Sequence, residues 1–113
     1  MLMRIATLIV VVGSLLSDNS AAVAQTTGVK FFEAKIRPVL IEHCYECHSA
    51  KAGKSRGGLK VDSKDALLRG GDTGPAIVSK LLTKSILYQS ILYRDDADYQ
   101  MPPKGKLPAS VIE

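Results

Sequence analysis

Cys44-Tyr45-Glu46-Cys47-His48 is a C-x-x-C-H motif that contains both cysteines of the chain and one of its two histidines. This spacing is typical of covalent haem attachment. Two thiols three positions apart can add to the two vinyl groups on one edge of a porphyrin, and the next residue brings an imidazole nitrogen to the iron. We therefore expect one haem c per chain, attached to Cys44 and Cys47 and bound through His48.

The first 24 residues have the pattern of a secretory signal peptide. Arg4 provides a positive start, residues 5–16 are predominantly apolar, and Ala22-Val23-Ala24 is a small-x-small cleavage site. This apolar run is shorter than the about 20 residues that a membrane helix needs. We expect a signal peptide over residues 1–24, export to the periplasm and one domain over residues 25–113. An N-terminal segment retained as a membrane anchor is the alternative.

The charge of the expected mature chain excludes some partner classes. It has 14 Lys and Arg against 10 Asp and Glu, a net charge of about +4. This weak, dispersed positive charge suits docking to an acidic redox protein and does not favour nucleic acid.

Apolar spacing and turn residues predict an all-α fold. Apolar positions 32, 36, 39, 40 and 44 predict a helix that follows a polar lead-in at 25–28 and runs into the motif. A kink is expected near Pro38, because proline has no N–H. We expect Phe31 and Phe32 to pack in the core. After the motif we expect a loop at 49–58 and a brief strand at 59–61. A helix should then begin at Lys64, capped by Asp62 or Ser63, and end at Gly70-Gly71. A further helix is expected from Ser79 or Ser85 to Tyr93, followed by a loop to Pro108 and the start of a helix at Ala109.

Met101 is the candidate for a second iron ligand. Signal cleavage would remove Met1 and Met3 and leave Met101 as the only methionine, in a loop stiffened by two prolines, 53 residues after His48. A thioether is a soft, neutral ligand suited to haem iron. His43 is the rival, but it directly precedes Cys44 and is expected on the same helix as His48. We therefore expect His43 to be a surface or packing residue.

Four segments of the chain resemble the planctomycete-type cytochrome c domain, within the class I cytochrome c family. The resemblance runs from about Phe31 to Pro108. Its motifs are FFEAKIRPVL (31–40), CYECH (44–48), RGGLKVDSKDALLRGGDTGPAIV (56–78) and ILYRDDADYQMPPKGKLP (91–108).

The resemblance implies a small all-helical haem domain. In it, Cys44 and Cys47 are the thioether attachment points, His48 is the proximal ligand and Met101 the distal one. Ligating imidazoles usually donate their other N–H to a carbonyl or carboxylate, and the resemblance implies that the Pro75 carbonyl accepts it. Two departures stand out: residues 79–82 replace the usual Pro-Gly turn, and the family's C-terminal helix is expected to be truncated here, as in a fragment of a longer exported protein.

The leading hypothesis is an electron carrier rather than an enzyme, by itself or as part of a larger exported oxidoreductase with redox partners not yet identified. A haem-based sensor or peroxidase-like module with a labile distal ligand is the alternative. A thiol-disulfide enzyme would need C-x-x-C in a βαβ setting, and strand signals are nearly absent. A structural zinc site would need four ligands, and the two cysteines and two histidines crowd into six consecutive positions.

Overall fold

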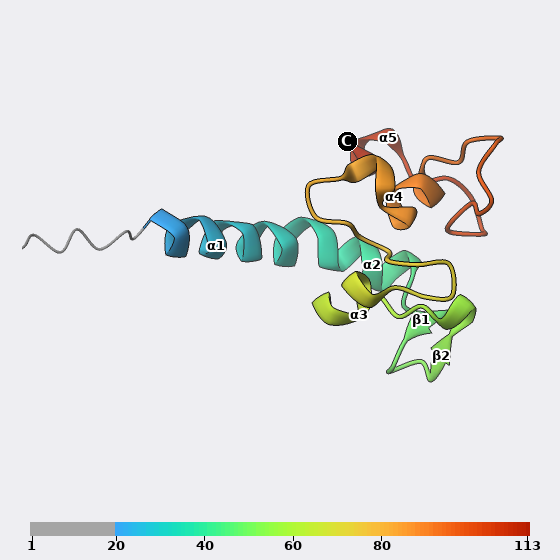
Figure 1. Ribbon diagram of the computed structural model, residues 1–113, viewed down its shortest axis with the longest axis horizontal. Coiled ribbons are helices and arrows are strands. Elements are labelled where there is room, and N and C mark those ends of the chain that lie inside the picture. The colour runs from blue at the N-terminus through green and yellow to red at the C-terminus, as the bar shows by residue number, and fades with distance from the viewer. Residues whose placement is uncertain (1–19) are drawn as a thin grey trace, which may run out of the picture.

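The computed structural model describes residues 20–113 (Figure 1), so most of the expected signal peptide lies outside the described residues. A long helical run leads into a body built from short helices, loops and one small hairpin. Among the described helices, none is both long and apolar enough to cross a membrane.

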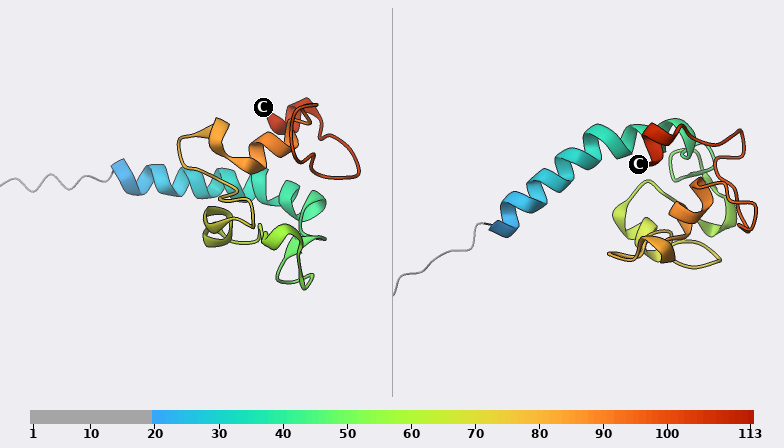
Figure 2. Two further views of the ribbon diagram at one scale, coloured as in Figure 1. Left: turned by 45° about the vertical axis from the view of Figure 1, so that its right-hand side comes forward. Right: turned by 90° about the horizontal axis from the view of Figure 1, so that it is seen from above.

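The helical run consists of α1 (Ser20–Phe31), a π-helical turn η1 (Phe32–Ile36) and α2 (Arg37–His43). Figures 1 and 2 show α1 extending away from the body. The predicted kink near Pro38 takes the form of the π turn, in which the Arg37 N–H donates to the Phe32 carbonyl. Two expectations were wrong: the polar lead-in at 25–28 is helical, and Phe31 is 59% exposed. Phe32 does pack against the core.

The all-α expectation holds only in part, because the described chain combines helices with long loops and a small antiparallel sheet. Strands β1 (His48–Ser49) and β2 (Lys54–Ser55) pair with His48 opposite Ser55 and Ser49 opposite Lys54. Gly53 completes the turn between them, with its N–H donating to the Ala50 carbonyl. The strand expected at 59–61 is absent from the described structure, although the Val61 N–H donates to the His48 carbonyl at 2.9 Å. The fold is therefore mixed, with helices, irregular loops and a two-stranded sheet.

Helix α3 (Lys64–Arg69) confirms the predicted limits. The Ser63 hydroxyl accepts the Ala66 N–H at 3.1 Å, and Gly70 follows as the C-cap. Between α2 and α3, a 3-10 turn η2 (Arg56–Gly58) follows the hairpin. Helix α3 contributes Leu67 to the core cluster, which also contains Leu40, Val61 and Ala76.

Helix α4 (Ile86–Ile91) begins at the later of its two expected starts, after a 3-10 turn η3 (Leu82–Lys84). A long loop then leads to α5 (Ala109–Ile112), where the start of a helix was expected. In Figure 1, α4 and α5 lie in the upper part of the body, above α2 and the hairpin.

Candidate functional site

A cavity of about 470 Å³ lies between α2, the hairpin region, α4 and the loop before α5. This volume is within the range of about 300–1,000 Å³ that is typical of small-molecule and cofactor sites. Its walls are mainly apolar, and the aliphatic residues that line it are Ile36, Val39, Leu40, Leu59, Val61, Ile86, Leu87, Ile91, Leu107, Val111 and Ile112. Such a cavity suits a large apolar cofactor.

Both thiols and the imidazole of the C-x-x-C-H motif line this cavity. The Cys44 N–H donates to the Leu40 carbonyl at 2.9 Å, which continues the backbone of α2 into the motif. The N–H groups of Cys47 and His48 both donate to the Cys44 carbonyl, at 3.2 and 3.0 Å. These two bonds wind the motif into a tight turn that presents its three reactive side chains to one cavity.

Cys44 and Cys47 are free thiols, and both are partly buried. Burial raises the pKa of the Cys44 thiol. The reactive cysteines of thiol-disulfide enzymes instead have lowered pKa values. The environment of Cys44 is thus opposite to the one that a redox-active dithiol needs.

The carbonyl beside the His48 ring is that of Leu59, whose oxygen lies 3.2 Å from Nδ1. This contact does not involve Pro75, whose role as the carbonyl partner stays a prediction. Pro75 is exposed and is not among the residues that line the cavity, although Gly74 is. Gly57 and Gly58, with φ of 62° and 69°, turn the chain so that Leu59 returns beneath the ring. The Gly-Gly pair is the sequence signal that could have identified this carbonyl.

Met101 lines the same cavity as His48. The Met101 N–H donates to the Ser90 carbonyl at 3.0 Å, and the Tyr93 hydroxyl donates to the Pro102 carbonyl. Leu107, 7% exposed, buries the far end of the loop. Tertiary packing thus places a thioether and an imidazole, distant in sequence, in the wall of one cavity.

Several charged or titratable side chains line the cavity in addition to those that the motif predicts. His43, expected to be a surface or packing residue, lines the cavity, as do Lys35, Arg56 and Asp72. His43 Nε2 also lies 3.7 Å from Glu42 Oε2. Its position follows from α2, which carries His43 and the start of the motif toward the same space.

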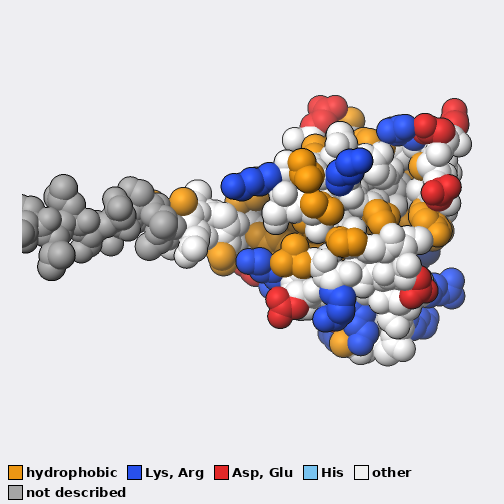
Figure 3. All heavy atoms as spheres, viewed as in Figure 1, with side chains coloured by type: hydrophobic (Ala, Val, Ile, Leu, Met, Phe, Trp, Pro, Cys, Tyr) orange, Lys and Arg blue, Asp and Glu red, His pale blue; other side chains and the backbone are white. Residues whose placement is uncertain are grey.

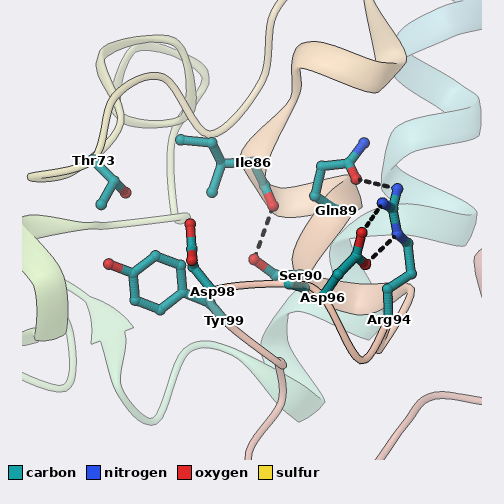
Figure 4. Close-up of a pocket in the computed structure, with 9 residues that line it drawn as sticks. Thr73, Ile86, Gln89, Ser90, Arg94, Asp96, Asp98 and Tyr99 are labelled. Carbon is teal, nitrogen blue, oxygen red and sulfur yellow. Dashed lines mark hydrogen bonds and ion pairs between the residues drawn. The ribbon is translucent and has the colours of Figure 1, made fainter.

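A second, more polar pocket of about 440 Å³ adjoins the first, since Thr73, Ile86, Ser90 and Tyr99 line both. Figure 4 shows Arg94 paired with Asp96 and bonded to Gln89 in this pocket. The hydrogen bond to Asp96 raises the pKa of Arg94, and the same bond lowers the pKa of Asp96. The Arg94 guanidinium is therefore already hydrogen-bonded to Asp96 and Gln89.

Comparison with known proteins identifies one family. The sequence model of the planctomycete cytochrome C family matches residues 44–105, which are 62 of the 113 residues. The matched range begins at the first cysteine of the motif and includes Met101. No curated protein and no solved structure matched the chain.

Proposed function

Because the chain belongs to the planctomycete cytochrome c family, we propose that it carries one covalent haem c and transfers single electrons. In this proposal, Cys44 and Cys47 form the two thioether bonds. His48 and Met101 would be the two protein ligands that hold the iron.

The observation that carries the proposal is the shared cavity. Two thiols, an imidazole and a thioether line one mainly apolar space of about 470 Å³. These are the groups that c-type attachment and His/Met ligation require. The donor set and the apolar walls therefore fit a haem.

The His48 nitrogen that would not bind iron, Nδ1, lies beside the Leu59 carbonyl. In the tautomer in which Nδ1 donates to the Leu59 carbonyl, Nε2 keeps a free lone pair with which to bind a metal. The carbonyl also fixes the plane of the ring. The Leu59 carbonyl thus holds the His48 ring in an orientation that leaves Nε2 available to bind iron.

When bound, haem supplies a couple between ferrous and ferric iron, and a His/Met pair raises its potential relative to many alternatives. Held by both His48 and Met101, the iron would serve as an electron carrier rather than as a binding site for a substrate. Aliphatic side chains form most of the wall of the site, and the loop of Met101 contributes to it. These features favour electron transfer over bond chemistry.

The direct test is production in a host with cytochrome c maturation. We expect the colour to remain with the protein after acid-acetone extraction, and to be lost from the Cys44→Ala, Cys47→Ala double variant. Met101→Ala should lose the weak red-end band of ferric haem that reports sulfur ligation. A colourless wild-type product contradicts haem attachment, and an unchanged Met101→Ala spectrum contradicts the second ligand.

Carbon monoxide distinguishes the carrier from a sensor or peroxidase-like module. A carrier with a firm methionine ligand should bind little carbon monoxide in the reduced state at neutral pH. Rapid, complete binding by the wild-type protein would instead support a labile distal ligand.

We propose further that the protein is exported and exchanges electrons with an acidic redox protein. Residues 1–24 support export by their signal-peptide pattern. On the face seen in Figure 3, hydrophobic side chains gather across the middle of the body, with both basic and acidic side chains above and below them. N-terminal sequencing of the periplasmic protein should begin at Gln25, and a chain that still begins at Met1 contradicts cleavage.

A further inference from the structure

We propose that Tyr93 is a positioning residue that holds the loop of Met101 against the cavity. The inference rests on the proposed function, because it assigns Tyr93 a role in maintaining the methionine as an iron ligand. Tyr93 itself does not line the cavity. It acts through the backbone of the residue that follows Met101.

The backbone of Tyr93 is in an unusual conformation. Its φ is 57°, and in the described structure only Lys80 and Tyr93 have positive φ among the residues other than glycine. A bulky side chain is unfavourable in this region and persists there only where the surrounding structure holds it. The left-handed turn comes two residues after the end of α4, and it directs the tyrosine toward the loop.

The contact that holds Tyr93 in place is with the loop. Its hydroxyl donates to the carbonyl of Pro102, nine residues later in the chain. Pro102 is buried, and the same carbonyl accepts the Gly105 N–H at 3.2 Å. The hydroxyl and the turn at 102–105 therefore converge on one oxygen, directly after Met101.

A second bond to the end of α4 holds the other side of Met101. The Met101 N–H donates to the carbonyl of Ser90, which is 7% exposed. Ser90 and Tyr93 are three residues apart, so one short segment holds the residue pair Met101-Pro102 at two adjacent points. Two further links from the loop lie on exposed side chains. The Gln100 side-chain amide donates to the Arg94 carbonyl at 3.3 Å, and Lys104 pairs with Glu46, whose side chains are 86% and 71% exposed. Exposed pairs hold weakly.

Loss of the hydroxyl should therefore make Met101 easier to displace. Imidazole measures this, because it competes with a methionine for its iron position. A hydrogen bond has a net free energy of about 1 kcal/mol, which corresponds to about a fivefold change in an equilibrium constant. We expect Tyr93→Phe in the holoprotein to keep the sulfur-ligation band and to bind imidazole about fivefold more tightly than wild type.

Tyr88→Phe is the matched control. Tyr88 lies on α4, is also partly exposed, and its hydroxyl makes no hydrogen bond within the described residues. Its imidazole affinity should stay within about twofold of wild type. Equal affinities in the two variants overturn the role of Tyr93.

If Tyr93→Phe does not acquire haem, two further variants test the role of the hydroxyl. Replacement of Tyr93 by 4-aminophenylalanine retains the ring and an N–H donor, and should restore the wild-type affinity. Replacement by 4-fluorophenylalanine retains the size without the donor and should bind imidazole more tightly. Identical affinities for these two overturn the inference while leaving Met101 as a ligand, whereas a wild-type spectrum without the sulfur band contradicts both proposals.

Discussion

His48 Nδ1 lies 3.2 Å from the carbonyl oxygen of Leu59, and the turn that brings Leu59 there packs against the glycine pair after α3. The Asp72 N–H donates to the Gly57 carbonyl at 2.8 Å. A Cβ atom on Gly71 would lie 2.3 Å from the Gly57 oxygen and 3.1 Å from the Leu59 nitrogen. The orientation of the imidazole therefore depends on the absence of a side chain at position 71.

Gly71→Ala tests this dependence. The new methyl group meets backbone atoms that cannot move independently, so we expect a loss of about 3 kcal/mol in the free energy of unfolding and a lower yield of haem-loaded protein. Gly53→Ala is the control, because Gly53 has φ of 63° but no atom within 4 Å of its Cβ position. It should lose only about 1 kcal/mol, for the backbone conformation. Equal losses in chemical denaturation contradict the packing argument.

Ser63→Ala should destabilise α3. The Ser63 hydroxyl accepts the Ala66 N–H at 3.1 Å, and the loss of such a cap costs about 1 kcal/mol. Ser79→Ala is the control, since Ser79 is exposed and its hydroxyl has no hydrogen bond within the described residues. Its change should stay below about 0.5 kcal/mol. Thermal unfolding of both variants measures the difference. An unchanged stability in Ser63→Ala would contradict the capping role of Ser63.

The π turn before Pro38 has an ion pair that predicts a pH effect. Arg37 Nε and Nη2 donate to Glu33 Oε2 and Oε1 at 2.7 and 2.8 Å. These hydrogen bonds lower the pKa of Glu33. Since the folded-state pKa is below the unfolded value, the contribution to stability is present at neutral pH and is lost as the pH falls through the folded-state pKa.

Carboxyl-carbon NMR titration measures this effect directly. The pKa of Glu33 should rise in Arg37→Gln, which removes the charge and the two-pronged donor. Arg37→Lys should give an intermediate value, because lysine keeps the charge without that geometry. If the pKa of Glu33 is the same in wild type and Arg37→Gln, the pair does not persist in solution.

The ion pair between Lys104 and Glu46 links the Met101 loop to the motif but should contribute little. Its Nζ to Oε2 distance is 3.2 Å, and both side chains are largely exposed. Exposed pairs typically contribute about 0.2–1 kcal/mol. Lys104→Ala should therefore change the free energy of unfolding by less than about 0.5 kcal/mol, and the change should shrink further at high salt. A loss above about 1.5 kcal/mol would show that the pair is a principal fastening of the loop.

Local chemistry and local hydrogen bonding could be predicted from the sequence. The motif at 44–48 predicted the attachment residues, because thioether chemistry depends on the spacing of two thiols. Ser63 and Gly70 bound α3 as expected, since capping involves only neighbouring backbone groups. The missing N–H of Pro38 likewise indicated where the helical run departs from α-helical geometry. In each case the deciding atoms lie within a few residues of one another.

Only the tertiary structure shows which residues are buried and which groups from distant segments lie close together. Helical spacing did not separate Phe32, which packs on the core, from the exposed Phe31. The Gly57-Gly58 turn brings the Leu59 carbonyl to His48, a contact that the sequence analysis did not predict. Only the packing of α4 and its loop against the motif places Met101 in the cavity of His48. The sequence by itself predicted which groups would bind a haem, and the long-range packing determined which carbonyl lies beside His48 and how Tyr93 meets the loop.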